Sequence, residues 1–131
     1  MTSAIYCDLT KLLGRALMSL MFISAGWNKI GGYADTQGYM ESAGVPGLLL
    51  PLVILVELGG GLAILLGFFT RWAALALALF SLASAWLFHY VPDDQMQMIN
   101  FMKNITIAGG FLILACAGAG KMSLDHRLRG K

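Results

Sequence analysis

The sequence predicts an all-α, integral membrane four-helix bundle that forms a single domain over residues 1–131. The chain is 58% hydrophobic and only 12% charged, with a mean hydropathy of +0.73, and these values lie outside the usual range of soluble domains. Four apolar segments also approach the length of about 20 residues with which a helix crosses a bilayer. These segments lie near residues 12–30, 46–69, 72–88 and 104–119.

The first segment, 12–30, has one face with a cation near each end. Its members follow one another at helical steps of three or four residues and are Arg15, Ser19, Phe22, Gly26 and Lys29. We expect this face to point into the bundle. A cleaved signal peptide is the alternative interpretation, but the small residues at 24–26 are followed by Trp27 and make a poor cleavage site.

The second segment, 46–69, contains Glu57 as its only charge. A carboxylate inside a membrane helix costs roughly 3 kcal/mol even on lenient insertion scales, so it normally has a partner or lines a wet cavity. A helix that starts near Pro46 places Glu57 about 16 Å deep, whereas a start at Pro51 places it about 9 Å deep. Small residues at 59, 63 and 67 predict a track along which another helix can approach closely.

The third and fourth segments, 72–88 and 104–119, contain no charge. Ser81, Ala85 and His89 share one face of the third helix by their spacing. The fourth segment is slightly short, so we expect tilt or its polar flanks to complete the span. Lys103, just before it, is in phase with Thr106.

The basic residues predict that both termini are cytoplasmic, because short loops rich in Lys and Arg stay on that side. Lys11 and Arg71 lie on one side of the expected helices, together with the tail residues Lys121, Arg127, Arg129 and Lys131. The opposite loops are richer in Asp and Glu. They are therefore assigned to the outer face.

In that topology several polar residues fall near the outer helix ends, where we expect them to surround one pocket with Glu57. Arg15 is a further binding candidate, since either Arg15 or Lys29 can form an ion pair with Glu57. This pair is interpreted either as a structural device that sets helix register or as part of a functional site. Anchoring at the membrane surface is the alternative role for the outer lysines and histidine. The ligand-binding candidates are Arg15, Asn28, Lys29, Glu57, His89, Lys103 and Asn104.

Other chemistries are disfavoured by composition. The two cysteines, Cys7 and Cys116, form no Cys-x-x-Cys motif, and His89 and His126 lie far apart in the sequence, so no metal site is expected. The glycine triplet at 59–61 lies inside an apolar helix and lacks the pattern of a nucleotide loop. Nucleic-acid binding is not expected, because the cytoplasmic flanks already account for the net charge of +2.

The chain resembles the DoxX family of small four-helix membrane proteins over nearly its whole length. The resemblance implies a bacterial inner-membrane protein with a redox role, since relatives include subunits of thiosulfate:quinone oxidoreductase and proteins associated with quinone or catechol stress. The residues that carry it are Gly14-Arg15-Ala16-Leu17, Phe22-Ile23-Ser24-Ala25-Gly26-Trp27-Asn28-Lys29, Val56-Glu57-Leu58-Gly59-Gly60-Gly61, Gly67-Phe68-Phe69-Thr70-Arg71, Lys103-Asn104, Gly109-Gly110 and Gly118-Ala119-Gly120-Lys121-Met122-Ser123-Leu124-Asp125.

Three functions follow as hypotheses. The leading one is a redox-associated subunit that binds a quinone or small phenol in the bundle, with Glu57 exchanging a proton and a partner protein supplying the redox centre. No catalytic motif in the chain itself identifies an enzyme. The second is a small proton-coupled transporter or exporter, which requires a homo-oligomer or a water path to both faces. The third is a structural subunit of a larger membrane complex.

Overall fold

The computed structural model describes residues 3–129, so Lys131 lies outside the described residues. Within that range four helical segments are long and apolar enough to cross a bilayer, which confirms the all-α membrane bundle. They are α1 (Ser3–Gly31), the run Gly47–Leu66, the run Thr70–His89 and α6 (Gln95–Ala117). Helices suit this environment because each satisfies its backbone hydrogen bonds internally.

The two middle spans each contain a π-helical turn. The run Gly47–Leu66 begins with a 3₁₀ turn (Gly47–Leu49) and α3 (Leu50–Ile54), passes through a π turn (Leu55–Gly59) and ends as α4 (Gly60–Leu66). The next run consists of α5 (Thr70–Ser84) and a second π turn (Ala85–His89). Outside the spans lie two shorter helices, α2 (Tyr33–Ser42) and α7 (Leu124–Arg129).

The helix starts predicted from hydropathy differ most from the observed ones in the first and fourth spans. The fourth helix starts at Gln95 rather than near residue 104, because the carboxylate of Asp94 caps it and accepts a hydrogen bond from the Gln97 amide at 3.2 Å. The first helix likewise starts at Ser3 rather than near residue 12. In both cases polar residues continue a helix beyond its apolar part, and a search for apolar length does not detect them.

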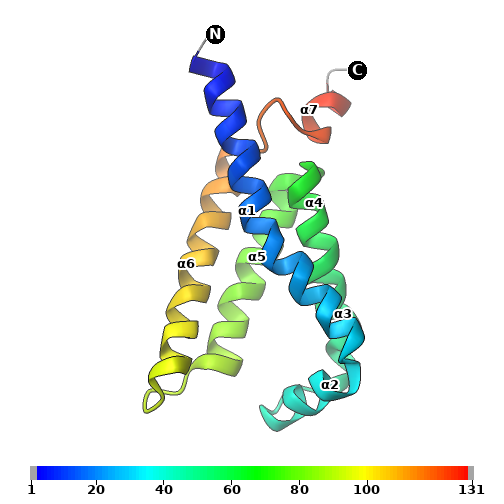
Figure 1. Cartoon of the computed structure of the whole chain (residues 1–131), viewed down its shortest axis with the longest axis vertical. Helices are drawn as coiled ribbons and strands as arrows, with labels where there is room; N and C mark the ends of the chain where they lie inside the picture. Colours follow the sequence, from blue (N-terminus) through cyan, green and yellow to red (C-terminus); the bar gives the residue numbers. More distant parts are fainter. Residues whose placement is uncertain (1–2, 130–131) are drawn as a thin grey trace.

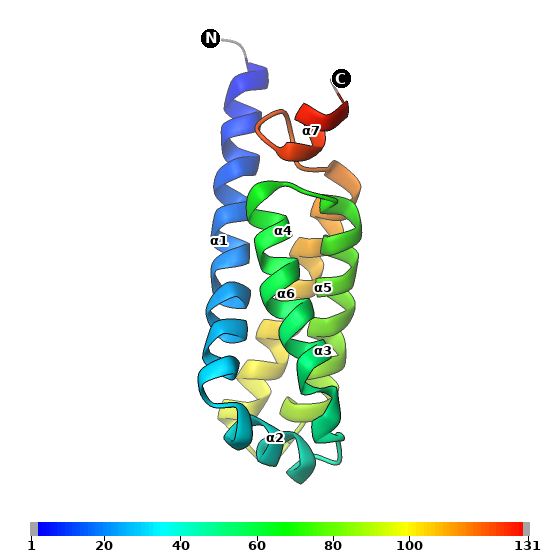
Figure 2. The ribbon, with the colours of Figure 1, turned by 90° about the vertical axis from the view of Figure 1, so that its right-hand side faces the viewer.

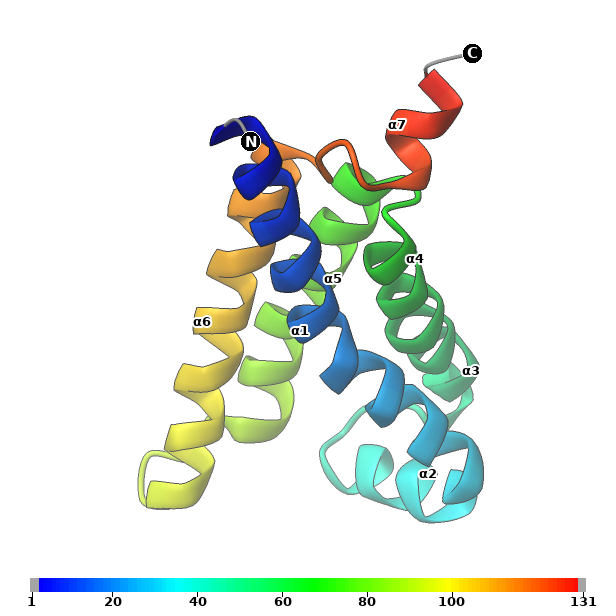
Figure 3. The same cartoon turned by 45° about the horizontal axis from the view of Figure 1, so that its top comes forward.

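The helices form two arms that meet near the end of the bundle where α1 begins and α7 lies (Figure 1). One arm is α5 with α6, and the other is α1 packed against α4 and the Leu55–Gly59 turn. Figure 2 shows the helices of both arms running along the same long axis. Toward the opposite end, where α2 lies, the arms diverge (Figures 1 and 3).

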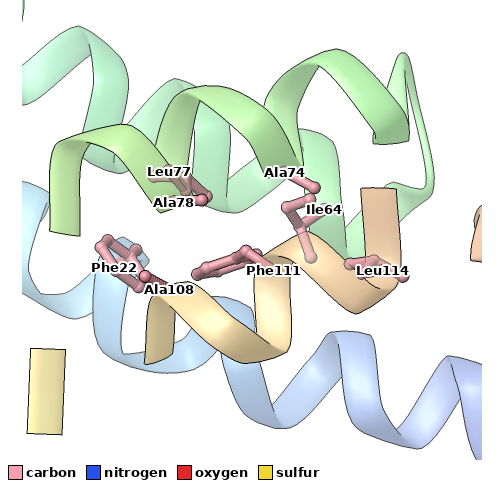
Figure 4. Close-up of a cluster of buried hydrophobic side chains, with 8 residues drawn as sticks. All are labelled: Phe22, Ile64, Ala74, Leu77, Ala78, Ala108, Phe111 and Leu114. Carbon is pink, nitrogen blue, oxygen red and sulfur yellow. The ribbon is translucent and has the colours of Figure 1, made fainter. Parts of the chain in front are cut away.

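A cluster of buried apolar side chains joins the two arms (Figure 4). Phe22 of α1 meets Phe111 of α6 edge to face, with ring centroids 5.4 Å apart. Three alanines in the cluster keep the helices close. The members are Phe22, Ile64, Ala74, Leu77, Ala78, Ala108, Phe111 and Leu114.

Glycines set the close approach of α1 to the second span. A Cβ atom on Gly26 would lie 2.8 Å from Cβ of Leu58, and one on Gly61 would lie 2.9 Å from Cγ1 of Ile23. The predicted small-residue track is wrong in phase, because Gly59 is exposed. Gly67, the last member of that track, instead ends α4 in the left-handed conformation, with φ of 70°.

Candidate functional site

Glu57 lies in the middle of the Leu55–Gly59 π turn and is buried, with 5% of its surface exposed. Such π turns occur frequently at functional sites. Glu57 is about 15 Å along the helix from Gly47 at 1.5 Å per residue, which agrees with the deeper of the two expected positions.

Lys29 is the partner of Glu57. Its Nζ lies 2.6 Å from Oε1 of the carboxylate, and its side chain keeps 28% of its surface exposed. The pair crosses from α1 to the π turn directly beside the Gly26–Leu58 contact, so the small Gly26 brings the two charges together. The predicted inward face of α1 is confirmed, since Arg15, Ser19, Phe22 and Gly26 are its buried residues.

The ion pair borders a cavity of about 330 Å³ between the diverging arms. This volume is at the lower end of the range of small-molecule sites, which is roughly 300–1,000 Å³. Apart from Lys29, Glu57 and His89, nearly all of the wall is apolar or aromatic. Leu52 and Leu87 are among the lining residues, and each is more than half exposed although it lies in a segment long and apolar enough to span a membrane. Part of the cavity wall therefore belongs to exposed apolar side chains of these segments.

His89 ends the second π turn and also lines the cavity. Its Nδ1 lies 2.8 Å from the side-chain oxygen of Gln97. Because an amide oxygen only accepts, this contact places a proton on Nδ1 and leaves Nε2 of a neutral ring as an acceptor. The site thus presents a lysine, a carboxylate and an imidazole from three different parts of the chain.

The helix α2 supplies a wall that sequence reasoning did not find. Tyr39 stacks on Phe88 with centroids 5.4 Å apart, and Gln37 donates to the carbonyl of Gly47 at 3.2 Å. Tyr39 and Phe88 both line the cavity. The only available signal was the aromatic content of the loop, because α2 has little apolar periodicity.

Arg15 lies at the other end of the bundle and takes no part in this cavity. It is 2% exposed and donates hydrogen bonds to four backbone carbonyls, those of Ile64, Leu65, Ala119 and Met122, at 2.7–3.1 Å. These carbonyls belong to the last turn of α4 and to the segment after α6, where helix geometry leaves oxygens without partners. Arg15 therefore ties three parts of the chain together.

The remaining candidates lie outside the cavity. Asn28 is exposed on α1. Lys103 is exposed on α6 and lines a separate shallow hollow with Met98 and Met102, while Asn104 is half-buried. The early start of α6 explains this outcome, because Lys103 lies two turns inside a helix whose buried face runs through Phe101 and Ala108. Lys29, Glu57 and His89 are thus the candidates that the fold brings together.

No group of three or more His, Cys, Asp or Glu side chains among residues 3–129 is placed to hold a metal ion. Cys7 and Cys116 are free and exposed.

The sequence of this chain is similar to those of known membrane proteins. The sequence profile of the DoxX family matches residues 10–90. The chain belongs to the DoxX family. It is 56% identical over 124 residues to the inner membrane protein YqjF of Escherichia coli K12, and the alignment covers 95% of each chain. It is also 41% identical over 123 residues to the inner membrane protein YphA of the same organism, with 88% of each chain covered. No solved structure gives a significant match.

The match to the DoxX profile includes every residue that lines the cavity, because these residues fall between Lys29 and His89. Lys103 and Asn104 lie beyond the matched residues.

Proposed function

We propose that the protein binds a small quinone or phenol in the cavity beside Lys29 and Glu57, as the membrane-embedded subunit of a redox system. The observation that carries the proposal is the presence, in one cavity, of a buried ion pair and a mostly apolar wall. A quinone or phenol needs both, because its ring is apolar while its oxygens form hydrogen bonds.

The three polar side chains have distinct roles in this proposal. Lys29 donates a hydrogen bond to a carbonyl oxygen of the ligand. Glu57 accepts from a phenolic hydroxyl and is the group that exchanges a proton. His89, with its Nδ1 held by Gln97, offers Nε2 as a second acceptor. A bound quinone supplies a two-electron, two-proton acceptor, and we assign the source of electrons to a redox partner protein.

We also propose that the chain lies in the inner membrane with both termini in the cytoplasm, which the distribution of basic residues supports. The cavity then belongs to the outer half of the bundle. The apolar cluster of Figure 4 lies on the side of the cavity toward the start of α1, since its members Phe22 and Ile64 lie nearer that end of the bundle than Lys29 and Glu57 do. This packing disfavours a ligand path through a single chain, so in this proposal the ligand enters and leaves past the exposed side chains of the cavity wall.

Binding of ubiquinone-1 to the purified protein in lipid nanodiscs tests the proposal. We expect saturable binding that weakens at least about tenfold in Lys29→Met and in Glu57→Gln, since each loses a charge-assisted hydrogen bond. Lys103→Met is the matched control, because it removes an exposed lysine outside the cavity, and its binding should equal that of the native protein.

Circular dichroism and size-exclusion profiles would establish that each variant is folded before its binding is interpreted. The absence of saturable binding of both ubiquinone-1 and catechol to the native protein would overturn the proposal. Proton flux into liposomes would then favour the transporter hypothesis, and altered co-purification of membrane proteins with Glu57→Gln would favour the structural one.

A further inference from the structure

A second hollow, of about 630 Å³, lies at the opposite end of the bundle from the quinone cavity. Its walls come from the second and third turns of α1, the start of α5 with the two residues before it, residues 117–121 and α7. Figures 1 and 3 show the loop 118–123 and α7 at the end of the bundle near the start of α1. No role proposed above uses this hollow.

Cations outnumber carboxylates around it by four to two. The cations are Lys11, Arg71, Lys121 and Arg129, and the carboxylates are Asp8 and Asp125. Within residues 3–129, none of the four cations lies within ion-pair distance of a carboxylate. Among the described residues, the hollow therefore has an excess of positive charge.

The two carboxylates are engaged by backbone amides. Asp8 accepts a hydrogen bond from the Lys121 amide at 3.1 Å. Asp125 accepts from the amides of Phe69 at 2.7 Å and Thr70 at 2.9 Å. These bonds hold the loop and α7 against the bundle, so both carboxylates help to build the walls of the hollow.

Glycines let the loop backbone lie against two of the cations. Gly118 and Gly120 have φ of 79° and 86°, a conformation that other residues rarely adopt. A Cβ on Gly118 would lie 3.4 Å from the Arg71 guanidinium, and one on Gly120 would lie 3.1 Å from Cδ of Lys11. The positions of these cations therefore depend on an ordered loop.

The rim of the hollow is apolar on the side of the membrane spans. Trp72 is 73% exposed and Phe69 is 61% exposed, and both lie beside Arg71. Trp is enriched at membrane–water interfaces because its ring is apolar and its N–H is polar. The hollow thus combines cationic and apolar surfaces in the order in which a lipid presents its headgroup and its chains.

We propose that this hollow is a binding site for the phosphate headgroup of an anionic phospholipid. Arg71 and Arg129 can each bind phosphate oxygens through two N–H groups, and the lysines add point charges. The acyl chains would lie along Trp72 and Phe69. Basic pockets between membrane helices bind anionic headgroups by the same chemistry. The site is independent of the ligand in the quinone cavity.

Native mass spectrometry of the full chain, released from nanodiscs of mixed phosphatidylcholine and phosphatidylglycerol, tests the proposal. We expect one phosphatidylglycerol to be retained in preference to phosphatidylcholine. Arg71→Gln and Lys121→Gln should each lower this preference by roughly fivefold. Arg127→Gln is the matched control, since Arg127 is exposed on α7 but does not line the hollow.

Two results would overturn the proposal. Equal retention of both lipids by the native protein is the first. Displacement of phosphatidylglycerol by low concentrations of inorganic phosphate is the second, because it would assign the hollow to a soluble anion instead. Equal melting temperatures of the native and variant proteins in phosphatidylcholine would show that a lost preference is not a folding defect.

Discussion

Lys29 reaches Glu57 from a neighbouring helix, and the two side chains differ in their access to solvent or lipid. The Nζ–Oε1 distance is 2.6 Å, but the Lys29 side chain is 28% exposed and the Glu57 side chain only 6%. Loss of the lysine leaves a buried carboxylate without a counter-charge. Loss of the carboxylate leaves a lysine that can extend toward water.

Lys29→Met should therefore destabilise the protein more than Glu57→Gln does. We expect a loss of about 3 kcal/mol for the first and about 1 kcal/mol for the second. The Lys29→Met/Glu57→Gln double variant should recover part of the loss seen in Lys29→Met. Unfolding by sodium dodecyl sulfate in mixed micelles measures these differences. A smaller loss in Lys29→Met than in Glu57→Gln would contradict the assignment of Glu57 as the more buried partner.

The contact between Gly26 and Leu58 should control the same ion pair through the backbone. Gly26→Ala places a methyl group 2.8 Å from Cβ of Leu58, so we expect α1 to move away from the second span at a cost of about 1–3 kcal/mol. Quinone binding should weaken as well, because Lys29 moves with α1. Unfolding and ubiquinone-1 titrations measure both effects.

Gly109→Ala is the control for this substitution, because nothing lies within 4 Å of its Cβ position. It should leave binding unchanged and stabilise α6 by up to about 1 kcal/mol. Similar losses for the two alanine variants would mean that a general sensitivity of helix glycines, rather than the Gly26–Leu58 contact, causes the effect.

Arg15→Lys should loosen the end of the bundle where α1 begins and α7 lies. A lysine has three donors and no planar fork, so it cannot reach all four carbonyls of the last turn of α4 and the segment after α6. We expect a loss of at least about 2 kcal/mol. Hydrogen exchange should accelerate in residues 119–129, whereas exchange in α2 should not change. Arg127→Lys, on the exposed face of α7, is the control and should resemble the native protein.

The pattern of apolar residues was sufficient to predict the fold, because in a bilayer the length and hydropathy of a segment largely decide whether it spans. The inward face of α1 was also predicted correctly from helical spacing. The start of α6 was not, since it depends on the Asp94 cap and on polar first turns that hydropathy does not register. Because α6 starts at Gln95, Lys103 lies inside the helix and outside the cavity.

The site was predictable only in part for a similar reason. A lone buried carboxylate requires a partner, so Glu57 was identified without coordinates. Glu57 pairs with Lys29 and not with Arg15 because of the level along α1 at which the second span packs against it. The Gly26–Leu58 contact sets that level. Arg15 binds backbone carbonyls, and no residue pattern in the sequence marks these as its partners.

The carboxylate of Asp125 caps α5 from a distant part of the chain, and this interaction should depend on pH. Its oxygens accept from the amides of Phe69 and Thr70 at the start of α5, where the helix has no side-chain cap of its own. Phe69 adopts φ of 47°, which is unfavourable for a bulky residue, and the cap helps to hold it there. Burial raises the pKa of Asp125, but the hydrogen bonds from Thr70 and Phe69 and the charge of Arg129 outweigh it, and the pKa lies below its ordinary value.

The sign of the pH effect follows from this lowered pKa. The contribution of the cap is complete above the unfolded pKa of about 3.9 and is lost as the pH falls through the lower folded value. Asp125→Asn should therefore be less stable than the native protein near neutral pH, and the difference should shrink toward zero in acid. Unfolding at a series of pH values measures it, with Asp93→Asn in the exposed α5–α6 turn as the control. A difference that grew on acidification would mean that Asp125 is stabilised in its protonated form, and the capping assignment would then fail.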